Sequence, residues 1–358
     1  MWPDRRLLEL FKTEFPILLA PMAGAMDQEL AIAAAQGGAL PSIPCALIPT
    51  EKAREQVNIL RQRVAVPINL NFFCHKPVAA DPARETIWKA RLAPYYKELG
   101  LDPAAPFAAA NRAPFDEAMC ALVEELKPEV ASFHFGLPDA AMMKRVKAAG
   151  AIVLSSATTV KEAIWLEENG ADVIIAQGAE AGGHRGMFLT ENIAEQPGTF
   201  ALVPQVVDAV KVPVIAAGGI ADGRGIAAAF ALGASGVQIG TAYLRCPESK
   251  IIAPARVALA QASDESTVIT NVMTGRPARG VANRTMREVG PISSDAPHFP
   301  HAATAIGPLK AAAEKLGRVD FTNLWAGQAV RMGREMPAAE LTRALAGSAL
   351  ARLQALGR

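Results

Sequence analysis

Short apolar runs and helical stretches alternate along the first 241 residues of this 358-residue chain. The runs are rich in Val, Ile, Leu and Ala and are too short for buried helices, which indicates strands. The stretches between them begin at capping residues and end at glycine, as helices do. Strands that are joined through helices run parallel in one sheet. The eight predicted strands lie within residues 15–22, 39–43, 66–73, 130–136, 151–156, 171–176, 213–219 and 236–241.

The number of strand–helix units favours one closed architecture. Eight units close a TIM-type (β/α)8 barrel, so we predict an α/β fold of this type. An open doubly wound sheet is the alternative. Such a sheet often carries a Gly-x-Gly-x-x-Gly fingerprint after its first strand, and none follows residues 15–22.

The pattern changes beyond Arg245, where helical stretches follow one another without clean strands between them. This change predicts a smaller, mostly helical C-terminal cap that serves as a substrate domain. We expect a cofactor-binding barrel at residues 1–250, the cap at residues 251–320, and helices that pack back on the barrel at residues 321–358. A polar, proline-rich insertion at residues 76–114 interrupts the barrel pattern.

Composition narrows the classes of function. Charged residues make up 20% of the chain and its formal net charge is +1, so we expect no nucleic-acid partner. Long apolar runs are interrupted before they could span a membrane, and the amino terminus lacks the apolar core of a signal peptide. We therefore expect a cytoplasmic protein without membrane contact. The four cysteines and five histidines lack the spacing of metal ligands, so no metal is expected.

A glycine-rich loop at residues 177–186 directly follows the predicted strand at residues 171–176. In a barrel the site forms where strands end, so a histidine in this loop is placed to act on a ligand. We predict that His184 is the catalytic residue, as a general base or as an imidazole that stabilises an anion. The alternative is a connector loop with a surface histidine. Glu180 is either a second base or an acceptor that fixes the loop.

Two further strand ends are rich in glycine, at residues 217–222 and 238–241. Consecutive ends of this kind often bind a phosphate group through backbone N–H groups. The amides of Asn71 and Gln177 can donate and accept toward a planar heterocycle, so the predicted cofactor is flavin mononucleotide (FMN). The alternative is that these glycines only permit tight turns. The cofactor-binding candidates at the strand ends are Met22, Asn71, Gln177, Gly218, Gly219, Gln238, Gly240 and Thr241.

Three residues are candidates for contact with the substrate. His134 lies between Phe133 and Phe135 near the end of the fourth predicted strand, where it is either a site residue or a buried core histidine. His75 lies just past the third strand. Lys310 is a solvated helix residue unless the cap folds over the site, in which case it offers an anionic substrate a positive charge.

Four segments at these strand ends resemble those of the bacterial class I nitronate monooxygenases, formerly called 2-nitropropane dioxygenases. They are Leu19-Ala20-Pro21-Met22-Ala23-Gly24, Asn71-Phe72-Phe73-Cys74-His75, residues 177–186 and residues 216–241. The resemblance implies an FMN-dependent enzyme that oxidises alkyl nitronates, with propionate 3-nitronate as the expected substrate. It implies reaction with O2 through a flavin semiquinone, giving a carbonyl compound and nitrite.

The resemblance also assigns roles to residues. It implies that His184 takes a proton from neutral nitroalkanes. It adds Gly182, Gly183 and Ile239 to the predicted FMN-binding residues. The expected partners are therefore a small nitronate and O2, and the sequence does not decide between a monomer and a dimer.

Two other functions stay open at this point. Flavin-dependent enoyl-acyl carrier protein reductases share the barrel and an Ala-Gly-Gly-His loop, but Gln177-Gly178 stands where we expect an acidic residue in those enzymes. A non-catalytic barrel that carries flavin or another phosphate ligand is the third interpretation.

Overall fold

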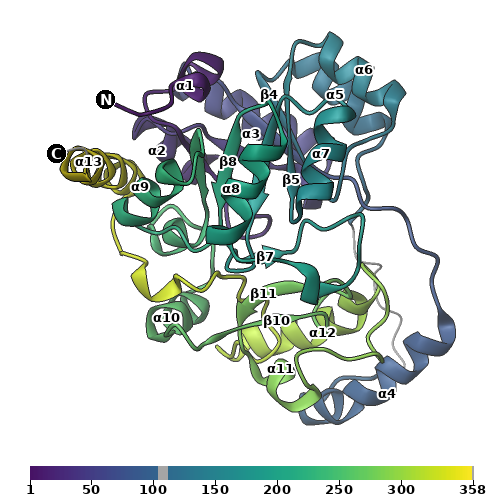
Figure 1. Ribbon diagram of the computed structural model, residues 1–358. Coiled ribbons are helices and arrows are strands. Elements are labelled where there is room, and N and C mark those ends of the chain that lie inside the picture. The colour runs from purple at the N-terminus through teal and green to yellow at the C-terminus, as the bar shows by residue number, and fades with distance from the viewer. Residues whose placement is uncertain (104–111, 357–358) are drawn as a thin grey trace.

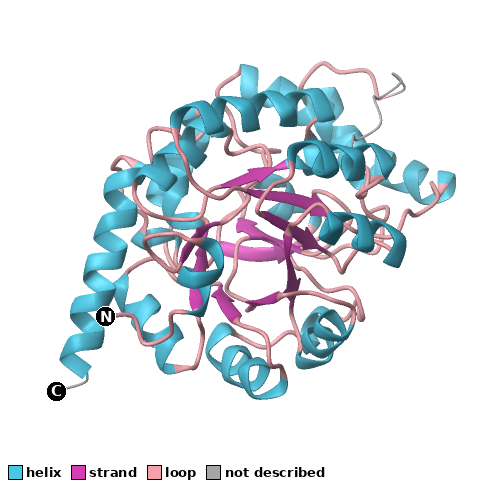
Figure 2. Cartoon of the chain, turned by 90° about the horizontal axis from the view of Figure 1, so that it is seen from above, coloured by secondary structure: helices cyan, strands magenta, loops and turns pink. Residues whose placement is uncertain are grey.

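Eight parallel strands form the centre of the molecule in the computed structural model, which describes residues 1–103 and 112–356. They are β1 (Ile17–Leu19), β2 (Ser42–Pro44), β3 (Asn69–Phe73), β4 (Val130–His134), β5 (Ile152–Ala157), β6 (Val173–Gln177), β8 (Val214–Ala217) and β9 (Gly236–Ile239). Their order in the sheet is β1-β9-β8-β6-β5-β4-β3-β2. The sheet closes because Leu40, just before β2, pairs with Leu18 of β1. Seen from above, the strands ring the centre and helices surround them (Figure 2).

Within the described residues, eight helices cover this sheet and alternate with its strands. They are α2 (Gln28–Gln36), α3 (Thr50–Arg63), α5 (Glu117–Leu126), α6 (Ala140–Ala148), α7 (Val160–Glu168), α8 (Thr199–Ala209), α9 (Gly223–Ala231) and α13 (Ala338–Leu356). Asp27, Asp139 and Asp222 cap their helices by accepting from backbone N–H groups of the first turn. The last helix, α13, packs against α9 and α2 and completes the ring. The predicted TIM-type barrel is confirmed.

The alternation of side chains along each strand decides which residues reach the barrel interior. Leu18, Leu154 and Ile215 pack with Leu7 and Phe11 of α1 (Arg6–Phe11), which covers the amino-terminal ends of the strands. The residues beside them along the strands pack in the separate core between sheet and helices. Toward the carboxyl-terminal ends, the same interior positions become polar. They are Asn71, His134, Ser156, Gln177 and Gln238.

A second unit, which we name the cap, lies beside the barrel (Figure 1). Its helices are α4 (Pro82–Glu98), α10 (Ala253–Gln261), α11 (Arg284–Val289) and α12 (Ala302–Lys315). Its sheet consists of β10 (Thr267–Thr270), β11 (Ala278–Val281) and β7 (Gly183–His184). In the described chain as a whole, barrel included, the short 3-10 helices are η1 (Cys45–Leu47), η2 (Ile193–Glu195), η3 (Thr241–Arg245) and η4 (Val330–Met332). The division of the chain at residues 250 and 320 stays a prediction.

The cap sheet corrects the expectation of helices without strands beyond Arg245. β10 and β11 pair antiparallel, with Thr267 opposite Val281, and β11 also pairs with β7. β10 is made of β-branched residues, which favour a strand. β11 contains Gly280 and has no such preference, so it becomes a strand because it lies between two partners.

Of the helices in residues 1–103 and 112–356, none combines the length and apolar character needed to cross a membrane.

The proline-rich insertion contains a helix, α4, that the sequence analysis did not predict. Asp81 caps it, and Pro82 occupies its first turn, where the missing N–H does no harm. Its buried face packs on α12. The Trp88 indole N–H donates to the carbonyl of Ala302 at 3.3 Å, and the Tyr96 hydroxyl donates to a neighbouring carbonyl of α12 at 2.6 Å. The insertion is therefore part of the cap.

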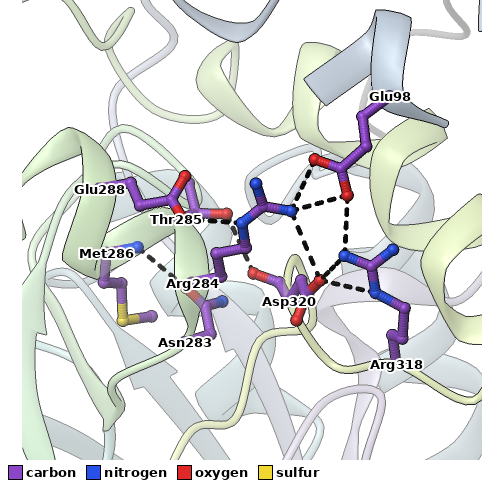
Figure 3. Close-up of polar contacts among 8 residues, drawn as sticks. All are labelled: Glu98, Asn283, Arg284, Thr285, Met286, Glu288, Arg318 and Asp320. Atoms are coloured by element: carbon purple, nitrogen blue, oxygen red, sulfur yellow. Dashed lines mark hydrogen bonds and ion pairs between the residues drawn. The ribbon is translucent and has the colours of Figure 1, made fainter. Parts of the chain in front are cut away.

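A cluster of charged residues also holds α4 in place (Figure 3). The carboxylate of Glu98, at the end of α4, accepts from Arg284 of α11 at 2.8 Å and from Arg318 at 3.0 Å. Arg318 also pairs with Asp320. We name these four residues the Glu98 cluster. It joins three parts of the cap that are far apart in the sequence.

Candidate active site

A cavity of about 360 Å³ lies where the barrel strands end and the cap meets them. Its volume falls in the range of small-molecule sites, and active sites of barrels form at this end of the strands. Most of the predicted site residues line it. They are Met22, Asn71, His134, Gln177, Gly182, Gly183, His184, Gly218, Gly219, Gln238, Gly240, Thr241 and Lys310.

Two of the predicted site residues do not line this cavity. Ile239 is buried in the core between sheet and helices, because neighbours on a strand point to opposite faces and Gln238 takes the interior direction. His75 is buried against Phe299, with ring centroids 4.8 Å apart. Burial, followed by the positive charge of Arg276, lowers the pKa of His75 to about 4. Their roles toward cofactor and substrate stay predictions.

One side of the cavity is formed by backbone at the ends of β8 and β9. Gly218 and Gly219 have φ values of +119° and +68°, which residues with a side chain rarely adopt. A Cβ atom at Gly218 would lie 2.8 Å from the hydroxyl oxygen of Thr199. After Gly240, η3 begins without a side-chain cap, so its first N–H groups are left for solvent or a ligand. We name residues 218–219 and 240–241 the glycine wall.

The loop that carries His184 is fixed from two directions. The Gln177 amide donates to the His184 carbonyl at 3.0 Å and accepts from the Gly186 N–H at 2.7 Å. On the cap side, Ala278 pairs with His184 in the β11–β7 ladder. Gln177 therefore lines the cavity while its amide holds the loop, which sequence reasoning did not foresee.

Two charged residues of this loop maintain its shape. Arg185 is fully buried, and its guanidinium donates to the carbonyl oxygens of Gly178 at 3.0 Å and Gly183 at 2.9 Å. Glu180 accepts from the N–H of Thr199 at 2.7 Å and from its hydroxyl at 2.8 Å. Neither side chain lines the cavity. Of the two roles expected for Glu180, the structure shows the acceptor that fixes the loop.

His134 points into the barrel interior and is held at both ring nitrogens. Its Nε2 lies 3.2 Å from the His184 carbonyl oxygen, which can only accept, so Nε2 carries the proton. Its Nδ1 lies 3.1 Å from Ser156 Oγ and accepts from that hydroxyl when the ring is neutral. Burial lowers the pKa of His134 to about 3, so the ring is neutral near pH 7. Contact of His134 with substrate stays a prediction.

His184 lines the cavity inside a group of aromatic rings. The ring centroids of Phe299 and Trp325 lie 5.4 Å and 5.5 Å from its own. Its Nε2 lies 2.9 Å from Thr274 Oγ1. Burial, then the positive charge of Arg112, holds the pKa of His184 well below its usual range. The imidazole is therefore neutral near pH 7, which is the state a general base requires.

Another part of the cavity lining is made of large and charged side chains. We name Phe73, Arg112, His184, Lys310 and Trp325 the side-chain wall. Arg112 lies over the Phe299 ring at 5.7 Å, and Lys310 is 3.9 Å from the Glu314 carboxylate. The sequence did not mark Arg112 or Trp325, because neither belongs to a motif at a strand end. The wall places two cationic groups beside the cavity.

In the described part of the chain, His, Cys, Asp and Glu side chains form no group of three or more that could hold a metal ion. The candidate site instead combines backbone groups, amides, aromatic rings and a neutral imidazole. The fold and this cavity define a (β/α)8-barrel protein whose candidate site lies between the barrel and a cap.

Comparison with known proteins identifies the family. The family model described as nitronate monooxygenase matches residues 4–347, and the chain belongs to this family of oxidoreductases. Curated nitronate monooxygenases from Paraburkholderia phytofirmans and Pseudomonas aeruginosa are each 42% identical to it. The matches cover 94% of this chain and 93% of the first relative, and 95% of this chain and 97% of the second.

Solved structures share the fold, and one of them is a nitroalkane oxidase. The nitroalkane oxidase of Streptomyces ansochromogenes superposes with a TM-score of 0.89 at 35% identity, covering 98% of this chain and 99% of that one. FabK from Thermotoga maritima superposes with a TM-score of 0.73 at 26% identity, with 98% of both chains covered. The enoyl reductase domain of MlnA from Bacillus amyloliquefaciens, at 12% identity and a TM-score of 0.67 over 99% of both chains, shares the fold alone.

Proposed function

We propose that this protein is an FMN-dependent nitronate monooxygenase that uses O2 to convert alkyl nitronates to a carbonyl compound and nitrite. The observation that carries the proposal is the neutral imidazole of His184, which faces the same cavity as the glycine wall. A base and a phosphate-binding surface in one cavity suit a flavin enzyme that accepts carbon acids. Membership of the nitronate monooxygenase family supports the choice of substrate class.

The residues present fit FMN. A phosphate group needs close backbone donors, and Gly218, Gly219, Gly240 and Thr241 bring backbone to the cavity lining. Asn71 donates its amide N–H to Ser132 Oγ at 2.9 Å, which leaves its oxygen as an acceptor on the cavity wall. Gln238 adds a second amide there. The chemistry that FMN supplies when bound is electron transfer from the nitronate toward O2.

His184 supplies the proton chemistry. A neutral nitroalkane must first lose its α-proton, and the unprotonated imidazole accepts it. A nitronate has already lost that proton, so it reacts without this step. The low pKa of His184 keeps the base unprotonated across neutral pH. The rings of Phe299 and Trp325 pack against this imidazole.

Two cations on the side-chain wall favour an anionic substrate. Arg112, Lys250 and Lys310 line the cavity together with the Glu314 carboxylate, which is 3.9 Å from Lys310. Burial lowers the pKa of Arg112 because its charge loses solvation. A substrate with a carboxylate in addition to the nitronate group would satisfy that charge. Propionate 3-nitronate has both groups, and we propose it as the substrate.

An anaerobic spectrum tests the proposal. The purified protein is expected to carry flavin whose absorbance changes when propionate 3-nitronate is added without O2. Admission of air should restore the spectrum and release nitrite. A protein that turns over NADH with an enoyl thioester but leaves nitronate unchanged would be a reductase. Bound flavin with neither reaction would indicate a non-catalytic flavin carrier.

A further inference from the structure

Thr274 lies directly behind His184 and has no role in the proposed chemistry so far. It is completely buried, it does not line the cavity, and its hydroxyl oxygen lies 2.9 Å from His184 Nε2. The same hydroxyl lies 3.4 Å from the carbonyl oxygen of Arg276. Thr274 therefore touches the imidazole on the side away from the substrate space.

The segment that carries Thr274 is rigidly placed. It connects β10 to β11, and β11 pairs with the His184 loop, Arg279 lying opposite Gly183. The Arg185 N–H donates to the carbonyl of Pro277 at 2.9 Å, which ties the two segments together again. Gly275 has a φ of +90°, and a Cβ atom there would lie 2.2 Å from a carbonyl oxygen. The hydroxyl of Thr274 is thus held at a fixed place relative to the imidazole.

The hydrogen-bond directions select one tautomer of His184. A hydroxyl has one proton, and the Arg276 carbonyl can only accept, so the Thr274 hydroxyl donates there. It then accepts from His184 Nε2, which must carry a proton. Among the described residues, no group is hydrogen-bonded to His184 Nδ1. Nδ1 is therefore the unprotonated nitrogen that is available to a ligand.

We infer that Thr274 is a positioning residue that keeps His184 in the Nε2–H tautomer and so presents Nδ1 as the base toward neutral nitroalkanes. This inference rests on the proposed function. In the reaction, the α-proton moves from the substrate carbon to Nδ1, and the electron pair of the broken C–H bond stays on the substrate as the nitronate. The Nε2–H bond to Thr274 persists through this step.

The surroundings leave Thr274 as the acceptor for Nε2–H. The titratable and charged groups that influence His184 are Arg112, His134, Arg185 and Arg276, and none is an anion. A carboxylate behind the ring would stabilise the imidazolium and hold the proton on it. A neutral hydroxyl orients the ring without holding that proton on it, so the imidazole can lose the proton again before the next turnover.

A pair of variants tests the inference. Thr274→Val keeps the shape of the side chain but removes the acceptor, whereas Thr274→Ser keeps the hydroxyl. We expect kcat/KM for a neutral nitroalkane to fall about tenfold in Thr274→Val, the effect of losing one hydrogen bond to a group that becomes charged. kcat/KM for propionate 3-nitronate should stay within about twofold. Thr274→Ser should recover most of the nitroalkane activity.

A spectroscopic measurement does not depend on turnover. Imidazole ¹⁵N shifts, with the His184 signals assigned by their loss in His184→Asn, should show a protonated Nε2 and an unprotonated Nδ1 in the wild-type protein. An Nδ1–H tautomer would overturn the inference even if Thr274→Val failed to fold. Equal losses on nitroalkane and nitronate in a folded Thr274→Val would also overturn it. A wild-type protein with the Nε2–H tautomer but no nitrite release would contradict the proposed function alone.

Discussion

The two sides of the cavity are built from different kinds of chain. The glycine wall is backbone from two consecutive strand ends of the barrel, and its geometry depends on the absence of side chains. The side-chain wall takes residues from β3, the insertion, the β6 loop, α12 and the segment after it. The glycine wall can bind a phosphate group, which many barrels bind at this end of their strands. The side-chain wall can be specific to one reaction. The comparison predicts that cofactor binding and catalytic chemistry can be changed separately by substitutions in the two walls.

The largest effect is expected from Gly218→Val, which gives the glycine wall a side chain. The backbone at φ +119° and the close Thr199 hydroxyl leave no room for it. We expect roughly 3 kcal/mol of destabilisation and loss of bound flavin, and therefore of all activity. Flavin absorbance after gel filtration and thermal unfolding measure both effects.

Gly307→Ala is the matched control. This glycine lies within α12, and a Cβ atom there would meet nothing within 4 Å. It should bind flavin normally and gain up to about 1 kcal/mol of stability. Retention of stoichiometric flavin by Gly218→Val would show that the two walls do not divide the work as described.

The next effect is expected from His184→Asn on the side-chain wall. Loss of the base should lower kcat/KM for a neutral nitroalkane by about 10²- to 10⁴-fold, with a much smaller loss for the nitronate. Flavin content should not change. Because the pKa of His184 is held low, wild-type nitroalkane activity should not decline as pH falls from 8 to about 6. Steady-state kinetics on both substrates give the comparison, and His301→Asn in the cap serves as the control.

A smaller effect is expected from Lys310→Met. The charge of Lys310 should matter for a nitronate that has a carboxylate and not for an uncharged alkyl chain. KM for propionate 3-nitronate should rise about tenfold, equivalent to about 1.4 kcal/mol, with kcat unchanged. KM for propyl-2-nitronate should stay the same. Lys315→Met, an exposed lysine of the same helix, should alter neither value, and an equal rise for both substrates would argue against charge recognition.

The smallest effect is expected from Glu98→Gln in the Glu98 cluster, which supports the cap from a distance. Hydrogen bonds from Arg318, then Arg284, hold the pKa of Glu98 below its usual value. Its contribution to stability is therefore present above the ordinary carboxyl pKa and is lost as pH falls through the lowered one. The melting difference from wild type should be small at pH 7, shrink in high salt and vanish at low pH. The control is Glu55→Gln, which removes an exposed single ion pair with Lys52 on α3.

The sequence was sufficient for what is encoded locally. The eight strands, their parallel order and the glycine-rich strand ends follow from periodicity and turn residues that are close in the chain. His184 was found because its loop begins directly after β6. The alternation of side chains along a strand also explains why Ile239 does not line the cavity as predicted. Gln238 and Ile239 are neighbours in sequence but point to opposite sides of the sheet.

What could not be predicted depends on pairings between distant segments. Arg112, Thr274 and Trp325 meet His184 only because the cap folds over the barrel, and no residue near them in sequence indicates it. α4 was missed for another reason. Its buried residues Trp88, Leu92 and Tyr95 do recur with helical spacing, but the polar and proline-rich composition around them obscured this signal.

The position of α13 has a consequence for the order in which the molecule can be made. The Tyr243 hydroxyl is 2.8 Å from the Thr342 hydroxyl, and a Cβ atom at Gly37 would lie 2.6 Å from the same threonine. α13 thus closes against α2, which is synthesised about three hundred residues earlier. During synthesis on the ribosome, α2 lacks its packing partner α13 until the whole cap has been synthesised. The faces of α2 and α9 that α13 covers therefore stay uncovered on the nascent chain until synthesis is almost complete.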